Sequence, residues 1–171
     1  ATNILKKNSI KFGLNHCTNI YPSDFQYARL NCISQLIKKY PKNPIGLSDH
    51  SKSNLIALAS IPLGVSMIEK HFVDTKNRKG PDISSSMDEK DLKNLIENSK
   101  NIFSSIEGDK KILKKELIVS KFAFASVVSI RKILKGEKLS LKNIWVKRPG
   151  SGDFLAKDLP KLIGKKAKKE I

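Results

Sequence analysis

Short apolar runs alternate with amphipathic segments of helical length over the first part of the chain. Two of these runs, Ile45–His50 and Val65–Phe72, each contain or end at a histidine, and a single helix-sized segment lies between them. Strands separated by one helix are typical of the parallel sheets of α/β proteins. The pattern therefore predicts neighbouring parallel strands whose carboxyl ends deliver polar side chains to one shared edge.

The same periodicity extends to the flanking segments. We expect, in order, a helix end, a strand, a helix, a strand, a helix, a strand and a helix at residues 1–8, 10–16, 24–40, 45–50, 53–62, 65–72 and 88–108. Asp88 and Glu89 place acidic groups in the first turn of the last helix, where the helix dipole favours them. The polar stretch Val73–Met87 lacks periodicity and is long for a connector, which is typical of a functional loop.

The pattern changes after residue 121. Short strands are expected at Phe122–Ile130 and Ile144–Val146, with turns at Gly136, Pro149-Gly150 and Gly152. We therefore divide the chain into an α/β part (1–108), a charged linker (109–121) and a small, mainly β domain (122–171).

The composition is that of a globular protein, with 39% hydrophobic residues in a chain of 171. No apolar run approaches the roughly 20 residues that span a bilayer, and the first residues lack the apolar core of a signal peptide. We expect a cytoplasmic protein without a membrane partner. Its cysteines, Cys17 and Cys32, lack metal-type spacing and are expected to be free thiols.

A net charge of +17 raises the question of a polyanionic partner, because lysine and arginine supply salt-dependent affinity for phosphate backbones. The lysines are spread over every expected element, aromatic residues make up only 6%, and no nucleic-acid-binding motif accompanies them. We interpret them as a solvated surface and expect no nucleic-acid partner. A module that binds an anionic polymer remains the alternative.

The chain has three histidines, and His16, His50 and His71 all fall at predicted strand ends. Neighbouring strands lie about 4.8 Å apart, so imidazoles at adjacent strand ends can converge on one cation. Two nitrogen ligands leave positions open for water and substrate, which a Lewis-acid site requires. A structural, hydrogen-bonded histidine is the alternative for each, and it is our interpretation of His16.

Other polar residues at this edge allow two interpretations each. Ser48 and Asn19 can donate hydrogen bonds to an anion such as phosphate or can cap the following helices. Tyr21 can face the site or pack on the core.

The acidic residues are equally open to two interpretations. Glu69 can orient a ligand histidine or pair with Lys70. Asp82 is either a turn residue beside Pro81 or a substrate contact.

Six segments, in this order and over nearly the whole chain, resemble the bacterial sialic acid synthase (N-acetylneuraminate synthase) family. The segments are Asn19-Ile-Tyr21-Pro22, Gly46-Leu-Ser48-Asp-His50, Ile68-Glu69-Lys70-His71-Phe72, Gly80-Pro81-Asp82, Phe122-Ala-Phe-Ala-Ser126 and Trp145-Val-Lys-Arg148-Pro-Gly150.

The resemblance implies the C-terminal portion of a (β/α)8 TIM barrel, with its last three strand–helix units, followed by a small antifreeze-like (SAF) domain. Because an intact barrel needs about 250 residues, we expect the first five units to be missing and the SAF domain to be incomplete. In the family, the missing half carries the lysines that hold phosphate and a catalytic glutamate.

The implied reaction condenses phosphoenolpyruvate with N-acetylmannosamine to N-acetylneuraminate and phosphate. The reaction implies a divalent metal that polarises the sugar aldehyde, with manganese as the first choice and magnesium or cobalt as alternatives. Two alternatives to this function remain: a synthase of pseudaminic or legionaminic acid from the same family, and an inactive truncated fragment.

The resemblance also implies roles for individual residues. His50 and His71 match the metal ligands, and we assign Glu69 and Asp82 as candidate catalytic residues. The positions that match substrate contacts are Ser48 and Asn19 for phosphoenolpyruvate, and Tyr21 and Asp82 for the amino sugar.

Two matched residues lie in the small domain. Arg148 matches an arginine that reaches the barrel of the partner subunit, and Phe122 matches an aromatic residue beside that contact. The implied assembly is a domain-swapped homodimer.

Overall fold

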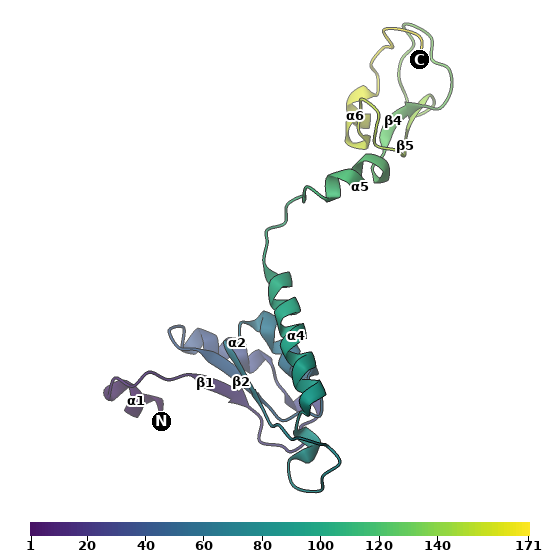
Figure 1. Cartoon of the computed structure of the whole chain (residues 1–171). Coiled ribbons are helices and arrows are strands. Elements are labelled where there is room, and N and C mark those ends of the chain that lie inside the picture. Colours follow the sequence, from purple (N-terminus) through teal and green to yellow (C-terminus); the bar gives the residue numbers. More distant parts are fainter. The chain divides into compact units, whose positions relative to one another are not determined.

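The computed structural model describes residues 1–171, which form two compact units, Ala1–Gly108 and Asp109–Ile171 (Figure 1). The N-terminal unit contains α1 (Thr2–Lys7), β1 (Leu14–Cys17), α2 (Asn31–Lys39), β2 (Ile45–Asp49), α3 (Leu55–Ser60), β3 (Met67–Lys70) and α4 (Glu89–Ile106). The C-terminal unit contains α5 (Glu116–Ala123), β4 (Ser126–Ser129), β5 (Ile144–Lys147) and α6 (Leu159–Leu162).

The N-terminal unit is built on a parallel sheet with the strand order β1-β2-β3. One face of this sheet is covered by helices. Ile45 and Leu47 of β2 are both 2% exposed and pack with Ile33 of α2 and Ile56 of α3 in the main core cluster. Burial of these side chains, each contributing about 1.5–3 kcal/mol, fixes the register of the sheet.

The opposite face, which we call the open face, has no helix on it. Asn15, Gly46 and Met67 lie side by side there in the strand register, and both Asn15 and Met67 are exposed. A Cβ at position 46 would collide with the side chains of its two neighbours, so only glycine fits between them. The residues that continue these strands on the open face reach the predicted site.

The C-terminal unit pairs β4 with β5 in an antiparallel ladder. Its core consists of Ile133, Leu139, Ile144 and Ala167, with Leu159 and Leu162 packed against them. Asn143 is 1% exposed; its side-chain amide donates to the Lys138 carbonyl, and its side-chain oxygen accepts from the Ser140 amide. The loops of this small unit are therefore held by buried polar contacts as well as by apolar packing.

The structure corrects two predicted elements. The helix expected at 24–40 is interrupted by Arg29, which has a φ of 42°, so that only Asn31–Lys39 is α-helical. The strand expected from Phe122 begins at Ser126, because Glu116–Ala123 form α5, which also occupies the second part of the segment predicted as a linker.

Cys17 and Cys32 are both unpaired. None of the helices is long and apolar enough to cross a membrane.

Candidate active site

The carboxyl ends of the three parallel strands bring candidate residues into one row on the open face. Cys17 is paired in register with Ser48, and Ser48 with Glu69. Because side chains alternate between the two faces of a strand, these three lie on the same face. His50 and His71 follow two residues beyond Ser48 and Glu69.

The rings of the two histidines lie close together. Their ring centroids are 5.1 Å apart, and the rings are nearly perpendicular. Nδ1 of His50 lies 3.0 Å from the Thr18 carbonyl oxygen, which can only accept a hydrogen bond, so this nitrogen carries the proton. Nε2 of His50 is therefore left with a free lone pair, which is the form in which imidazole binds a metal.

Tyr21 forms one side of this arrangement. Its ring centroid lies 4.0 Å from that of His50 and 5.7 Å from that of His71, and the residue is 49% exposed. Desolvation raises the pKa of the Tyr21 phenol above its usual value, and the nearby Cys17, Asp82 and Glu69 raise it further. The phenol therefore stays a neutral hydrogen-bond donor at physiological pH.

The long polar loop brings Asp82 to the second histidine. Its carboxylate oxygen Oδ2 lies 3.8 Å from Nδ1 of His71. Asp82 has a φ of 63°, uncommon outside glycine, and the hydroxyls of Ser85 and Ser86 donate to its carbonyl oxygen. The loop returns to the strand end through a hydrogen bond from the Met87 amide to the His71 carbonyl, 2.8 Å long. This placement agrees with a loop over the site.

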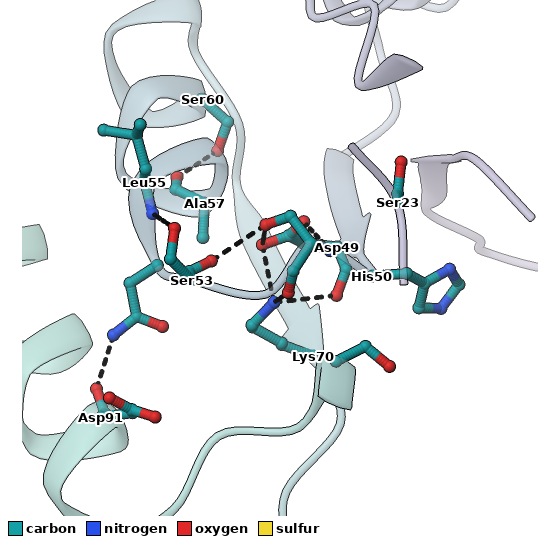
Figure 2. Close-up of polar contacts among 12 residues, drawn as sticks. Ser23, Asp49, His50, Ser53, Leu55, Ala57, Ser60, Lys70 and Asp91 are labelled. Atoms are coloured by element: carbon teal, nitrogen blue, oxygen red, sulfur yellow. Dashed lines mark hydrogen bonds and ion pairs between the residues drawn. The ribbon is translucent and has the colours of Figure 1, made fainter. Parts of the chain in front are cut away.

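Behind the histidines, on the helix-covered face, lies a buried ion pair between Lys70 and Asp49 (Figure 2). The exposed fractions of their side chains are 1% and 3%, and Nζ lies 3.0 Å from Oδ2. Sequence reasoning missed this pair, because it placed Lys70 beside Glu69. Adjacent strand residues point to opposite faces, and this alternation was the signal that could have found it.

The third histidine of the chain lies apart from the site. His16 does not join the other histidines: it is 7% exposed, on the helix-covered face, and its Nε2 lies 2.7 Å from the Ala28 carbonyl oxygen. His16 is therefore a structural, hydrogen-bonded histidine, which confirms the interpretation made from the sequence.

The helix-capping interpretation is wrong for both Ser48 and Asn19. The N-cap positions of α2 and α3 are occupied by Leu30 and Asn54, and neither helix has a side-chain cap. The Asn19 side-chain oxygen instead accepts from the Cys17 thiol. Both side chains stay at the strand ends near the histidines.

Phe122 and Arg148 belong to the C-terminal unit, where both are exposed. The Gly150 amide donates to the Lys121 carbonyl, so the loop after Arg148 is tied to α5, which carries Phe122.

The residues present fit a divalent cation. Imidazoles about 5 Å apart, one with its tautomer fixed by a backbone carbonyl, are suited to share one ion. No third His, Cys, Asp or Glu completes a ligand cluster, so water or substrate would fill the remaining positions.

The parallel sheet, its strand-end histidines and the small β unit together define an α/β protein with an open two-histidine site. The NeuB family model matches residues 1–111, and the SAF domain model matches residues 124–171. The chain belongs to the NeuB family.

Its relatives include named synthases. A protein of Methanocaldococcus jannaschii, itself uncharacterized, is 36% identical over 154 residues, 89% of this chain and 45% of that protein. The N,N'-diacetyllegionaminic acid synthase of Campylobacter jejuni is 39% identical over 105 residues, 60% of this chain and 31% of the enzyme. Further relatives are synthases of pseudaminic acid and of N-acetylneuraminate 9-phosphate.

A solved structure agrees with the fold. The N-acetylneuraminic acid synthetase of Leptospira borgpetersenii matches with a TM-score of 0.62 and 33% identity, over 69% of this chain and 41% of that one. The chain spans less than half the length of each of the curated relatives named above.

Proposed function

We propose that this chain is the C-terminal part of a synthase that condenses phosphoenolpyruvate with N-acetylmannosamine, giving N-acetylneuraminate and phosphate. The observation that carries the proposal is the pair His50 and His71, whose rings lie close together at adjacent strand ends of a NeuB-family sheet. Because the chain spans only part of its relatives, the proposal concerns the whole enzyme to which these residues contribute.

In the proposed reaction, C3 of phosphoenolpyruvate forms a bond to the aldehyde carbon of the open-chain sugar, and the aldehyde oxygen takes up a proton. Water adds at C2, and the bond between C2 and the phosphate-bearing oxygen breaks, so that phosphate leaves with that oxygen. A divalent cation, manganese in the first instance and magnesium or cobalt as alternatives, would be held by His50 and His71. Such an ion supplies Lewis-acid chemistry toward an aldehyde oxygen.

The side chains around the histidines divide between the two substrates. Ser48 and Asn19 offer a hydroxyl and an amide at the strand ends, and we assign them to phosphoenolpyruvate. Tyr21 is a neutral phenol donor stacked on His50, and we assign it to the amino sugar. Its position against the metal ligand would place the sugar beside the ion.

Two carboxylates are the candidate catalytic groups. Glu69 is exposed on the open face in register with Ser48, which suits a base that takes a proton from the water adding at C2. Asp82 reaches the same edge from the loop, beside His71, where it can accept a hydrogen bond from a sugar hydroxyl.

A legionaminic or pseudaminic acid synthase is the second candidate. It is favoured by the 39% identity to the N,N'-diacetyllegionaminic acid synthase of Campylobacter jejuni. The chemistry at the strand ends would be the same, and only the acylated sugar would differ.

The proposal is tested by measuring phosphate release from phosphoenolpyruvate with and without Mn²⁺. The assay is applied to this chain and to a chain extended upstream to the length of its relatives. N-acetylmannosamine and an N,N'-diacetylated amino sugar are compared as the second substrate. In the active form, His50→Ala and His71→Ala should each reduce the rate by more than the roughly 10–100-fold that loss of an outer-shell partner costs. Lys93→Ala, which breaks only an exposed ion pair on α4, is the control.

Metal-dependent activity with one sugar would support the proposal and choose the branch. Metal-independent activity, or full activity in both histidine variants, would contradict it. A folded extended protein that is inactive with both sugars would favour the non-catalytic alternatives.

We propose in addition that the enzyme is cytoplasmic and works as a domain-swapped homodimer, with Arg148 and Phe122 of one subunit completing the site of the other. A planar, permanently charged guanidinium suits the oxygen-rich sugar and its amide group. The exposure of both residues supports the dimer, because neither is used in the core of its own unit.

A further inference from the structure

The buried Lys70 ammonium contacts three oxygen atoms from the strand end next to its own. Nζ donates to Oδ2 of Asp49 at 3.0 Å, to the Asp49 carbonyl at 3.4 Å and to the Ser51 carbonyl at 2.5 Å. Figure 2 shows the ammonium directed at Asp49, while the His50 imidazole points away from the pair.

The position of these carbonyls along the chain is the important feature. Asp49 and Ser51 are the residues immediately before and after His50, and Lys70 immediately precedes His71. The Lys70 ammonium therefore links the backbone on both sides of His50 to the residue next to His71.

The Asp49 carboxylate completes the connection. Its Oδ1 accepts from the Ser51 amide at 2.8 Å, and the Ser51 hydroxyl lies between its Oδ2, at 3.1 Å, and the Ser53 carbonyl oxygen, at 2.9 Å. The loop that leaves β2 is thus folded around the carboxylate, with His50 held at the turn.

A requirement for stability alone does not explain this arrangement, because buried ion pairs can often be replaced by neutral residues of similar volume without loss of stability. We propose that Lys70 and Asp49 are positioning residues: their buried pair sets the spacing and orientation of His50 and His71, and so the affinity of the site for a divalent cation. This inference rests on the proposed function of the two histidines as metal ligands.

The test compares single and double substitutions in this chain, with Mn²⁺ alone as the probe. Lys70→Met and Asp49→Asn each leave one buried charge without its partner and should lower thermal stability. The double variant Asp49→Asn/Lys70→Met removes both charges and should regain the stability of the parent. Its Mn²⁺ dissociation constant, measured from the paramagnetic resonance of free Mn²⁺, should nevertheless be weaker by about 10–100-fold.

The control is a second lysine–aspartate pair in the same unit. Lys76 and Asp91 are 40% and 36% exposed and do not join the strand ends. The variant Lys76→Met/Asp91→Asn should bind Mn²⁺ as the parent does.

A double variant that regains both stability and Mn²⁺ affinity would show that the pair is only structural and would overturn the inference. If the double variant does not fold, Asp49→Glu provides the decision, since it keeps both charges and moves the carboxylate of the pair by one methylene group. Folded Asp49→Glu should bind Mn²⁺ more weakly than the parent, and equal binding would overturn the inference.

His50→Ala separates this inference from the function on which it rests. If His50→Ala binds Mn²⁺ as tightly as the parent, the proposed metal site is wrong and the inference fails with it. If His50→Ala loses Mn²⁺ while the double variant binds it normally, only the positioning role is wrong.

Discussion

Glu137 in the C-terminal unit has an unusually well-satisfied carboxylate. It accepts hydrogen bonds from the Arg131 guanidinium, the Leu134 amide and the Asn143 side-chain amide. The first and largest of these, from Arg131, and then the other two lower the pKa of Glu137 from its usual 4.5 to about 2. Because the folded pKa is depressed, the stabilisation is present above pH 4.5 and is lost as the pH falls toward 2.

We predict that the thermal stability of this unit falls over that pH window and that Glu137→Gln flattens the dependence. Trp145, the single tryptophan, lies in β5, so its fluorescence reports the unfolding of this unit. Glu170→Gln, which removes one contact to Lys132, is the control and should leave the dependence unchanged. An unaltered pH profile in Glu137→Gln would contradict the prediction.

At the scale of residues, the position of the candidate residues along the strands could be predicted from the sequence, whereas the contacts that hold them could not. His50, His71 and Glu69 could be placed because each lies at or just beyond the end of a recognisable strand. The partner of Lys70 could not be chosen from the pattern of residues along one strand, because Asp49 lies 21 residues away along the chain and its contact depends on the sheet register.

Strand β3 is an edge of the sheet, with β2 as its only partner in the sheet. Met67 on this strand is 38% exposed and lines an apolar groove together with Phe103 of α4, which is 64% exposed. Unpaired edges with apolar surface favour association. We predict that the chain by itself self-associates through this edge, and that Met67→Lys and Phe103→Lys each shift it toward monomer in light scattering over a concentration series.

The matched control for this edge is Ile4→Lys. Ile4 is 66% exposed on α1, in the same unit but outside the groove. A chain that is monomeric at high concentration, or one in which Ile4→Lys acts as strongly as the edge variants, would show that β3 is not the contact.

At the scale of elements, the predictions succeeded where the local signals agreed. Helix α4 was expected at 88–108 and forms at Glu89–Ile106, with the Asp88 carboxylate accepting from the Asp91 amide as an N-cap. Helix α5 was predicted as linker up to residue 121 and as strand from Phe122. The apolar run Leu117–Val119 lies within a charged stretch, and the next apolar run, from Phe122, is too short for its periodicity to distinguish helix from strand. Glu116 in its first turn and Lys121 in its last were the signals for a helix.

At the scale of the whole molecule, the candidate residues are divided between two units. The histidines and carboxylates lie in Ala1–Gly108, and Phe122 and Arg148 lie in Asp109–Ile171. The order of motifs along the chain predicted this division of residues. The order of motifs does not reveal whether a given site is completed by the C-terminal unit of its own subunit or by that of a partner, since this choice depends on assembly and not on local sequence.

Subunit mixing tests the proposed domain swap. The experiment uses whichever form of the protein, this chain or the chain extended upstream, releases phosphate from phosphoenolpyruvate. We predict that His50→Ala and Arg148→Ala are each inactive as homodimers, and that co-refolding them restores metal-dependent phosphate release. In the mixed dimer, the intact histidines of the Arg148→Ala subunit would be completed by the intact Arg148 of the other, because the swap pairs each sheet with its partner's small unit. If each subunit instead used its own Arg148, every site in the mixture would lack one residue, and activity would stay absent. Mixing His50→Ala with His71→Ala is the control: both defects lie in the same unit, so no site in that mixture would be complete under either arrangement.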